Sequence, residues 1–459
     1  MLLNQGVYGV VLIVDDQQLM KGLYTDGDVR RALLNGADLG DAAELHMNQE
    51  FTFATDDMGH MERINRLSEK IRHLPILDQE GRPVDMISWA EYWRLPVMEP
   101  SLGGNELRYV SDCISSNWIS SQGLYINRFE ETFRAYHSIE HSLSTSSGTA
   151  ALHLALLALG VGRGDEVVVP NLTFAATANA VLHCGATPVF VDVDRETWTL
   201  DPSALDGAIN STTRAIIPVH LYGHPCNMDP IMRIAQRYNI PIVEDCAEAL
   251  GAEYKGRLVG TFGTIACFSF FANKVITTGE GGMVITRDGD LHEKMTILRD
   301  HGMSRKKRYW HLVPGFNFRL TNLQAAVGLA QMERINDFID LRLKLAEMYD
   351  LRLADLEGVR LPPRAPWAKN IYWLYSIIID DASDVTRDDL AQKLRDLGIE
   401  TRPFFYPLHE QPPYKTNSKQ SFPVSSWLSE RGLSLPTASS VRSEDVDRVC
   451  RTIREVISR

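Results

Sequence analysis

The sequence predicts an α/β protein with a major lobe, a small C-terminal lobe and a separate N-terminal module. From Ser142 onward, short apolar strands alternate with helical patterns, which is typical of a largely parallel sheet covered by helices on both faces. A long helical stretch from Leu323 to Leu356 follows, and the chain then returns to mixed strand and helix. With 459 residues, the chain is too long for a single ordinary core.

The composition favours a globular protein that binds neither membrane nor nucleic acid. The chain is 44% hydrophobic and 23% charged, and its net charge of -12 argues against general nucleic-acid binding. Its 6 cysteines form no CxxC pair and no metal-ligand cluster, which predicts free thiols and no metal site. Because the sequence shows no charged-then-apolar leader and no apolar run long enough to span a bilayer, we expect a cytoplasmic protein.

Residues 1–92 form the predicted N-terminal module, a small α/β unit in which one pattern occurs twice. The first copy has an apolar strand over 7–14, a return strand over 19–25 and a helix over 26–35. The second copy, HLPILDQEGRPVDMISWAEYW, begins at His73 and has the same order of elements. The repeat predicts a module built from two similar halves.

This module resembles a pair of cystathionine-β-synthase (CBS) motifs, the first of which lacks its leading helix and strand. In that family, the Thr or Ser and the Asp after the last strand often hold the ribose of an adenine nucleotide. The matching residues here are Thr25 and Asp28 in the first copy and Ser88 and Glu91 in the second. The resemblance implies an adenine-nucleotide site, and the alternative is a module that only supports structure or dimerisation.

A linker with two prolines, over residues 93–100, leads to the major lobe, which is predicted over 101–340. An amphipathic helix from Gly104 to Ile114 is followed by a polar loop and a further helix. The strands of the sheet are expected at EVVVP, TPVFVDV, AIIPVHLYG and IPIVEDCA. The small C-terminal lobe covers 341–459, with Tyr372 to Ile379 as its clearest strand.

The stretch TIACFSFFANKVITTGEGGMVIT, which begins at Thr264, predicts two apolar strands around a loop that holds Lys274 and a glycine cluster. The apolar side chains next to this lysine are Phe268, Phe270, Phe271, Val275 and Ile276. They are expected to strip water from the ammonium group and lower its pKa, leaving an amine that forms a Schiff base with a carbonyl. The alternative is an ordinary surface lysine beside a hairpin.

Small residues open the helical run AALHLALLALG, at Ser146, Ser147, Gly148, Thr149 and Ala150. A helix that begins there places free backbone N–H groups and the positive end of its dipole at one point, which predicts an anion site. The alternative is an ordinary Ser/Thr helix cap.

Three further side chains occupy positions suited to a planar, phosphorylated ligand. Asp245 ends the strand IPIVED, at the mouth where α/β proteins bind ligands, and a carboxylate there keeps a pyridine nitrogen protonated. Phe174 follows the strand EVVVP and offers a ring for stacking, and Ser269 offers a hydroxyl to a phosphate. The alternatives are a helix cap for Asp245, a core position for Phe174 and a backbone hydrogen bond for Ser269.

An anion-binding helix start, a stacking aromatic ring, an acid for a ring nitrogen and a Schiff-base lysine are together what pyridoxal phosphate requires. The chain from about residue 95 to 459 resembles the sugar aminotransferases of the DegT/DnrJ/EryC1/StrS family, which have the aspartate-aminotransferase fold (fold type I) with a mixed, mostly parallel sheet. The motifs that carry the resemblance are WISSQG, SSGTAAL, PNLTFAATANA, PVHLYGHPCNMDPI, IVEDCAEALG, FSFFANKVITTGEGG, GFNFRLTNLQAAVG and RPFFYPLHEQPPY.

The resemblance implies that Lys274 forms the Schiff base, Asp245 pairs with the pyridine nitrogen and Phe174 stacks on the ring. Glu248 would lie near the phenolic oxygen of the cofactor, where relatives often have Gln or His. The phosphate would be held by Gly148, Thr149, Ala150 and Ser269 and, from the other subunit, by Asn317. That last contact implies a homodimer, or a tetramer, with shared active sites. A lysine at position 274, where a subset of relatives has histidine and performs a dehydration, favours transamination.

Within the family, the phrases WIS, FSFFANKVITTGEGG and RPFFYPLHEQPPY are most similar to members that transfer the amino group of L-glutamate to GDP-4-keto-6-deoxy-D-mannose, giving GDP-perosamine for the O-antigen of lipopolysaccharide. A UDP- or dTDP-linked keto sugar is the alternative substrate. The candidate substrate-binding residues are Trp118, Ser120, Arg308 and Arg402. The basic run from Arg305 to Arg308 would meet a pyrophosphate, or it forms a solvated loop. Two other functions stay open, a pyridoxal-phosphate sugar dehydratase and a nucleotide-sensing regulator.

Overall fold

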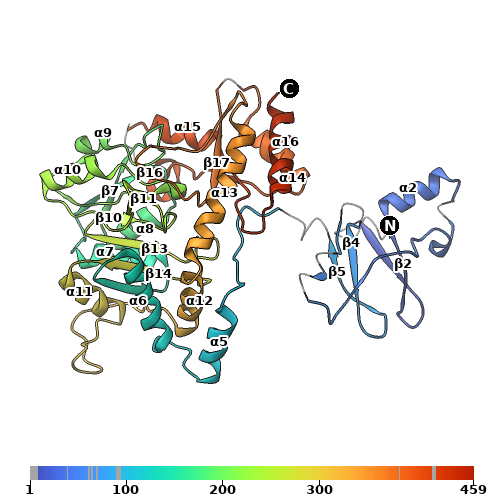
Figure 1. Ribbon diagram of the computed structural model, residues 1–459, viewed down its shortest axis with the longest axis horizontal. Coiled ribbons are helices and arrows are strands. Elements are labelled where there is room, and N and C mark those ends of the chain that lie inside the picture. Colours follow the sequence, from blue (N-terminus) through green and yellow to red (C-terminus); the bar gives the residue numbers. More distant parts are fainter. Residues whose placement is uncertain are drawn as a thin grey trace. The chain divides into compact units, whose positions relative to one another are not determined.

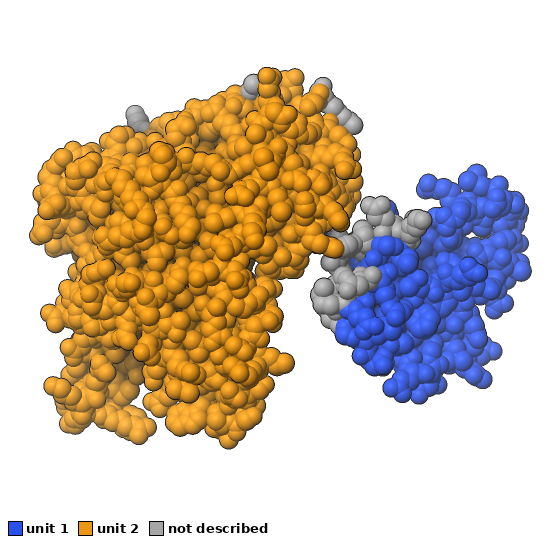
Figure 2. All heavy atoms as spheres, viewed as in Figure 1, with its two compact units in different colours: residues 1–95 blue, residues 96–459 orange. Residues whose placement is uncertain are grey.

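The computed structural model describes residues 9–458 except 39, 60–61, 64–65, 69–70, 89–94, 382 and 416–419. The chain divides into two compact units, Met1–Leu95 and Pro96–Arg459 (Figure 2). Each unit has its own apolar core. No helix in the described ranges is both long enough and apolar enough to cross a membrane.

The first unit is built from two small sheets. Strands β1 (Val10–Val14) and β2 (Met20–Thr25) pair antiparallel and lead into helix α2 (Asp26–Leu34). The second sheet contains β3 (Ala54–Thr55), β4 (His73–Leu77) and β5 (Pro83–Ser88), after the short helix η1 (Ala43–Leu45). Strands β1, β2, β4 and β5 and helix α2 lie where the sequence predicts them, whereas β3 and η1 were not predicted. Glu91 of the second expected CBS motif lies outside the described residues.

The second unit contains the mixed, mostly parallel sheet that the sequence predicts (Figure 1). In spatial order its strands are β8 (Thr187–Val191), β7 (Glu166–Pro170), β9 (Thr213–Ile216), β10 (Val243–Asp245), β13 (Ile265–Ser269), β14 (Gly282–Thr286) and β6 (His141–Thr145). Parallel bridges from Ile216 to Ile242 and from Val219 to Asp245 join β9 to β10. Strand β14 runs antiparallel to both of its neighbours.

Helices cover both faces of this sheet because successive strand residues point to opposite sides. On β13, Cys267 packs in the core that contains helix α7 (Gly148–Ala158), whereas Phe268 packs in the core that contains α6 (Leu124–His137). The other helices of the major lobe are α5 (Glu106–Ser115), α8 (Ala176–His183), α9 (Pro202–Leu205), α10 (Met228–Tyr238), α11 (Gly289–Arg299) and α12 (Asn322–Met332).

The helical stretch expected from Leu323 to Leu356 is two helices, α12 and α13 (Ile335–Leu353). The break falls at Glu333, whose carboxylate accepts hydrogen bonds of 2.6 Å from Asn105 Nδ2 and of 2.6 Å from the Tyr109 hydroxyl. These contacts tie the end of α12 to the α5 region, and α13 continues towards the C-terminal lobe. The stretch is therefore helical as predicted, with one break that the sequence pattern does not show.

The C-terminal lobe is an antiparallel sheet in the order β15 (Val359–Arg360), β17 (Tyr375–Ile379), β19 (Gly432–Leu435) and β18 (Arg402–Pro403). Helices α14 (Arg387–Asp396) and α16 (Ser443–Ile457) pack together, and α16 also packs on α13 (Figure 1). The strand expected from Tyr372 begins at Tyr375, because Tyr372 has a left-handed φ of 48°. The remaining short elements are β11 (Glu253–Tyr254), β12 (Arg257–Leu258), β16 (Ala368–Lys369), α15 (Pro423–Arg431), η2 (Asp206–Ala208), η3 (Leu221–Gly223), η4 (Leu408–Glu410) and η5 (Pro412–Tyr414).

Candidate active site

A cavity of about 380 Å³ lies where the main sheet meets the C-terminal lobe. Its walls come from the start of α7, the ends of β10 and β13, the loop that holds Lys274 and the segments around Trp373 and Arg402. A larger hollow of about 540 Å³ beside Trp427 has no lysine among its described lining residues. The first cavity is therefore the one lined by predicted site residues, among them Lys274, Asp245 and Phe174.

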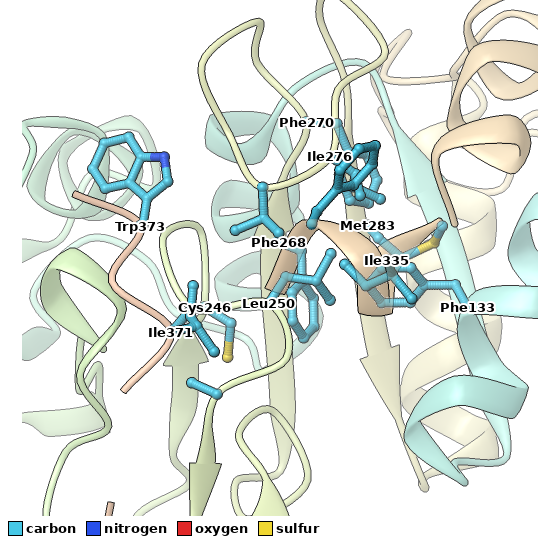
Figure 3. Close-up of a cluster of buried hydrophobic side chains, with 14 of the residues drawn as sticks. Phe133, Cys246, Leu250, Phe268, Phe270, Ile276, Met283, Ile335, Ile371 and Trp373 are labelled. Carbon is cyan, nitrogen blue, oxygen red and sulfur yellow. The ribbon is translucent and has the colours of Figure 1, made fainter. Parts of the chain in front are cut away.

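The loop that holds Lys274 packs on a buried apolar cluster. Phe268, Phe270 and Ile276 pack in one buried cluster beneath the loop (Figure 3). Only 13% of the lysine side chain is exposed, and its Nζ atom lies 3.9 Å from the centre of the Trp373 ring. Burial lowers the pKa of Lys274, while the carboxylates of the site act in the opposite direction. The predicted desolvation of this lysine is confirmed.

Asp245 stands at the C-terminal end of β10, on the floor of the cavity. Its Oδ2 atom accepts a hydrogen bond of 2.9 Å from the Thr177 hydroxyl, and its Oδ1 atom accepts one of 3.1 Å from the Ala247 amide. Burial raises the pKa of Asp245, and these two donors lower it again by stabilising the charged form. The Asp245 carboxylate is therefore buried and held in one orientation.

Glu248 lies three residues further on, in a turn, and is 3% exposed. Its Oε1 atom is 3.5 Å from Lys274 Nζ, and its Oε2 atom accepts a hydrogen bond of 3.0 Å from the Tyr222 amide. Burial raises the pKa of Glu248, whereas the positive charge of Lys274 lowers it. The backbone at Tyr222 is held in a left-handed conformation, with φ 52°, and this conformation places its amide at Glu248.

The start of α7, where the sequence predicts an anion site, lines the cavity. Ser147 caps the helix by accepting a hydrogen bond of 3.1 Å from the Ala150 amide. A methyl group added at Gly148 would lie 2.7 Å from the Cβ atom of Ser269, so glycine permits a close approach of helix and strand. Gly148, Thr149 and Ser269 all line the cavity. The helix start and the Ser269 hydroxyl therefore face one small volume.

Phe174 lines the cavity with a ring that is 58% exposed, and its centroid lies 5.8 Å from that of Phe405. A core position, the alternative considered from the sequence, does not match this exposure. An open aromatic face on the wall of a cavity is suited to stacking on a planar ligand.

Several of the predicted site residues do not line this cavity. Ala150 does not line the cavity, because its amide bonds to Ser147. Trp118 lines a separate open groove beside Asn322, and the carbonyl of Ser120 accepts a hydrogen bond of 2.6 Å from the Asn322 amide. Arg308 is exposed, and its guanidinium carbon lies 4.9 Å from the Tyr309 ring centre. Asn317 is also exposed and outside the cavity of its own chain.

Sequence reasoning missed four residues of the site. Thr177 anchors Asp245, and Tyr222 anchors Glu248. Trp373 lies against Lys274 and donates from Nε1 to the Asn273 carbonyl at 2.7 Å. The side-chain oxygen of Asn273 is buried without a hydrogen-bond partner in the described part of the chain. Thr177 follows Phe174 closely and Asn273 immediately precedes Lys274, whereas Tyr222 and Trp373 come from distant segments.

The first unit gives Thr25 and Asp28 a structural role. The Thr25 hydroxyl caps α2 by accepting from the Asp28 amide at 3.3 Å, and the Asp28 carboxylate accepts from the Thr25 amide at 2.9 Å. These bonds form a capping box. Ser88 is buried at 2% exposure. The geometry matches the structural alternative for this module.

The polar groups that line the cavity match the groups of pyridoxal phosphate. The helix start with Ser269 matches a phosphate, the Asp245 carboxylate matches a ring nitrogen, and the buried Lys274 amine matches an aldehyde. The fold and this site together define a fold-type-I enzyme that uses pyridoxal phosphate.

Comparison with known proteins agrees with this class. The model of the DegT/DnrJ/EryC1/StrS aminotransferase family matches residues 100–454. The GDP-perosamine synthase of Caulobacter vibrioides is 45% identical over 365 residues, which cover 79% of this chain and 98% of that protein. The crystal structure of DesV from S. venezuelae superposes with a TM-score of 0.75 at 36% identity, covering 80% of this chain and 99% of that one. The PLP form of the putative sugar aminotransferase Spr1654 from Streptococcus pneumoniae gives a TM-score of 0.75 at 29% identity, with 80% and 99% covered.

The chain belongs to the DegT/DnrJ/EryC1/StrS aminotransferase family. It is a pyridoxal-phosphate-dependent sugar aminotransferase, as the sequence motifs implied. The family match begins at residue 100 and gives no support to the pair of CBS motifs expected over residues 1–92.

Proposed function

We propose that this enzyme moves the amino group of L-glutamate onto GDP-4-keto-6-deoxy-D-mannose and so makes GDP-perosamine. The observation that carries the proposal is the buried contact between Lys274 and Glu248 in a cavity that also contains Asp245. The 45% identity to the GDP-perosamine synthase of Caulobacter vibrioides supports the choice of sugar nucleotide. A UDP- or dTDP-linked keto sugar is the alternative acceptor.

Pyridoxal phosphate, when bound, supplies an aldehyde that carries the amino group and a ring that withdraws electrons from the bond being broken. Asp245 would pair with the ring nitrogen, and Thr177 and Ala247 hold its carboxylate in place. Lys274 Nζ takes the proton from the amino-bearing carbon of glutamate and later delivers a proton to the carbon that was the sugar ketone. Burial favours the neutral amine that this transfer needs.

Water must be kept from the reacting atoms while the proton moves. Trp373 covers Lys274 on one side, and its indole nitrogen is fixed to the loop by the Asn273 carbonyl. Phe405 donates its amide to the Tyr222 hydroxyl at 3.1 Å, which attaches the C-terminal lobe to the floor of the site. Both lobes therefore take part in closing the cavity.

We also propose a homodimer, or a tetramer built from dimers, in which Asn317 reaches the phosphate of the neighbouring site. Asn317 is exposed in its own chain, and large apolar side chains are exposed in the same region, among them Tyr309 at 74% and Leu312 at 54%. Trp118 and Leu124 are exposed at 56% and 62%. Exposed apolar groups of this number are typical of a surface that another chain covers.

The experiment incubates purified holoenzyme with L-glutamate and a panel of GDP-, UDP- and dTDP-linked 4-keto-6-deoxy sugars. Mass spectrometry of the products is expected to show an amino sugar from the GDP compound, with 2-oxoglutarate as the second product. A dehydrated product would instead support the sugar dehydratase. A protein that binds a nucleotide and makes no product would support the regulator.

A further inference from the structure

The Trp427 hollow, a cavity of about 540 Å³, shares no described lining residue with the Lys274 cavity. Residues 194–198, which follow β8 of the major lobe, form one part of its wall, and residues 360–367 and Trp427 of the C-terminal lobe form another. Small-molecule sites in proteins typically enclose ~300–1,000 Å³. The hollow therefore has the size of a ligand site, and the proposed reaction does not use it.

Arginine side chains give this hollow a positive lining in an acidic chain. The charged residues that line it are Arg195, Arg360, Arg364, Asp194 and Glu196, within a chain whose net charge is -12. The guanidinium carbon of Arg195 lies 3.9 Å from the centre of the Trp427 ring, and that of Arg360 lies 5.5 Å from the same centre. Because an indole face attracts a cation, this ring holds both guanidinium groups beside the hollow.

Arg195 is the arginine whose charge is least compensated. The nearest carboxylate oxygen of Asp381 is 3.9 Å from its Nη2 atom, which is too long for a hydrogen bond. That carboxylate is already bound by Arg431 Nη2 at 2.6 Å and by the indole nitrogen of Trp427 at 3.1 Å. The N–H donors of Arg195 therefore stay available to a ligand.

The other two arginines are paired but keep donors as well. Arg360 donates from Nε to Asp380 at 2.6 Å, and Arg364 pairs with Asp350 through Nη2. A guanidinium group has five N–H donors in a planar fork, so one such bond leaves several of them. The fork matches two oxygens of a phosphoryl group. Arg195 and Arg360 together therefore offer a site for a multiply charged oxyanion.

The rest of the wall suits the organic part of a ligand. Its apolar members are Trp198, Pro202, Leu361, Pro362, Pro363, Pro366, Trp367 and Ile378. Proline rings fix the backbone of the segment 361–367, so this part of the wall is stiff. Trp367 adds an aromatic ring to which a planar group can bind by stacking. A ligand with a phosphoryl group at one end and an apolar or planar group at the other matches this wall.

We propose that the Trp427 hollow binds a small phosphate ester of nucleotide size, with its phosphoryl oxygens on Arg195 and Arg360. This site is additional to the proposed function, since it shares no residue with the reaction cavity. Arg195 belongs to the major lobe and Arg360 to the C-terminal lobe, so a bound ester joins the two lobes.

The first test titrates holoenzyme with inorganic pyrophosphate in a calorimeter. Arg195→Gln is expected to raise the dissociation constant by about 10- to 100-fold, because a charged hydrogen-bond donor is lost. Arg195→Lys keeps the charge without the fork and should recover part of that loss. Arg237→Gln removes an exposed arginine on α10 and should bind as the wild type does. Equal affinity of the wild type and Arg195→Gln would overturn the proposal.

A second variant separates this hollow from the Lys274 cavity, which has Arg402 in its lining. In the holoenzyme, Arg402→Gln should leave intact the pyrophosphate site that Arg195→Gln weakens. If Arg402→Gln weakens pyrophosphate and Arg195→Gln does not, the anion binds in the Lys274 cavity and the proposal is wrong.

The third test compares ligands on the wild type and on the double variant Arg195→Gln/Arg360→Gln. The double variant should lose one GDP site per chain, and GDP should bind that site at least as tightly as pyrophosphate does. Glutarate, which carries two carboxylates and no phosphoryl group, should bind it about tenfold more weakly. Weaker binding of GDP than of pyrophosphate would contradict an ester as the ligand, and equal binding of glutarate would contradict a phosphoryl group.

Discussion

The Nζ atom of Lys274 lies 3.5 Å from the Oε1 atom of Glu248, and both side chains are largely shielded from water. In this pair, burial favours the neutral form of each partner, while the charge of each favours the ionised form of the other. This balance decides how readily Lys274 presents a free amine. It also makes the site sensitive to small changes around Glu248.

Glu248→Gln keeps the size of the side chain and removes its charge. The pKa of Lys274 should fall further, because the carboxylate that raises it is gone. The acid limb of the pH profile for covalent capture of pyridoxal phosphate by the cofactor-free enzyme should move to lower pH. Glu253→Gln, which removes the carboxylate that pairs with Lys369, should leave the profile in place. A profile that moves to higher pH would contradict this account of the pair.

Gly148→Ala tests the anion site at the start of α7. The added methyl group would lie 2.7 Å from the Cβ atom of Ser269 and must push the helix start away from the strand. We expect a loss of about 1–3 kcal/mol in unfolding free energy and a weaker affinity for the cofactor. Gly162→Ala is the control, because nothing lies within 4 Å of its added carbon. Equal cofactor affinity in the two variants would argue against a phosphate at this helix.

The buried imidazole of His137 predicts a pH dependence of stability. Burial lowers the pKa of His137 to about 4, and the ring lies against Phe133 with centroids 4.5 Å apart. The unfolded chain takes up this proton near pH 6.5 and the folded chain only near pH 4, so the stability that this residue supports is complete above pH 6.5 and decreases as the pH falls towards 4. Between pH 6.5 and 5 the loss is about 2 kcal/mol.

His137→Phe should remove this part of the acid sensitivity, measured as the difference in thermal unfolding midpoint between pH 7 and pH 5. His311→Phe changes an exposed histidine and should retain the sensitivity of the wild type. The same acid shift in both variants would show that His137 does not control it.

The sheet and the core of the site follow from local sequence patterns. The place of Lys274, Asp245 and Phe174 in the cavity was predictable because Asp245 ends an apolar strand and the other two lie in the loops that follow such strands, where an α/β fold presents side chains to a ligand. Trp373 was not predictable in this way. It meets the lysine loop through a contact between segments about a hundred residues apart, and local periodicity does not report such a contact.

The same limit applies to the helical stretch and to Arg308. The pattern from Leu323 to Leu356 remains helical on both sides of Glu333, and the break is fixed by hydrogen bonds to distant Asn105 and Tyr109. Arg308 was a candidate because of its charge; the structure shows that it is exposed, and its role in substrate binding stays a prediction. Residues fixed by long-range contacts therefore required the structure.

The central claim is that Lys274 is the amine that binds the cofactor and moves the proton. Holoenzyme that is reduced with borohydride and then digested should yield one peptide with a pyridoxyl group, attached at Lys274. The Lys274→Ala variant should fold, should give no labelled peptide, and should lose turnover by about a thousandfold or more. A pyridoxyl group on a different lysine, or wild-type turnover by Lys274→Ala, would contradict the account.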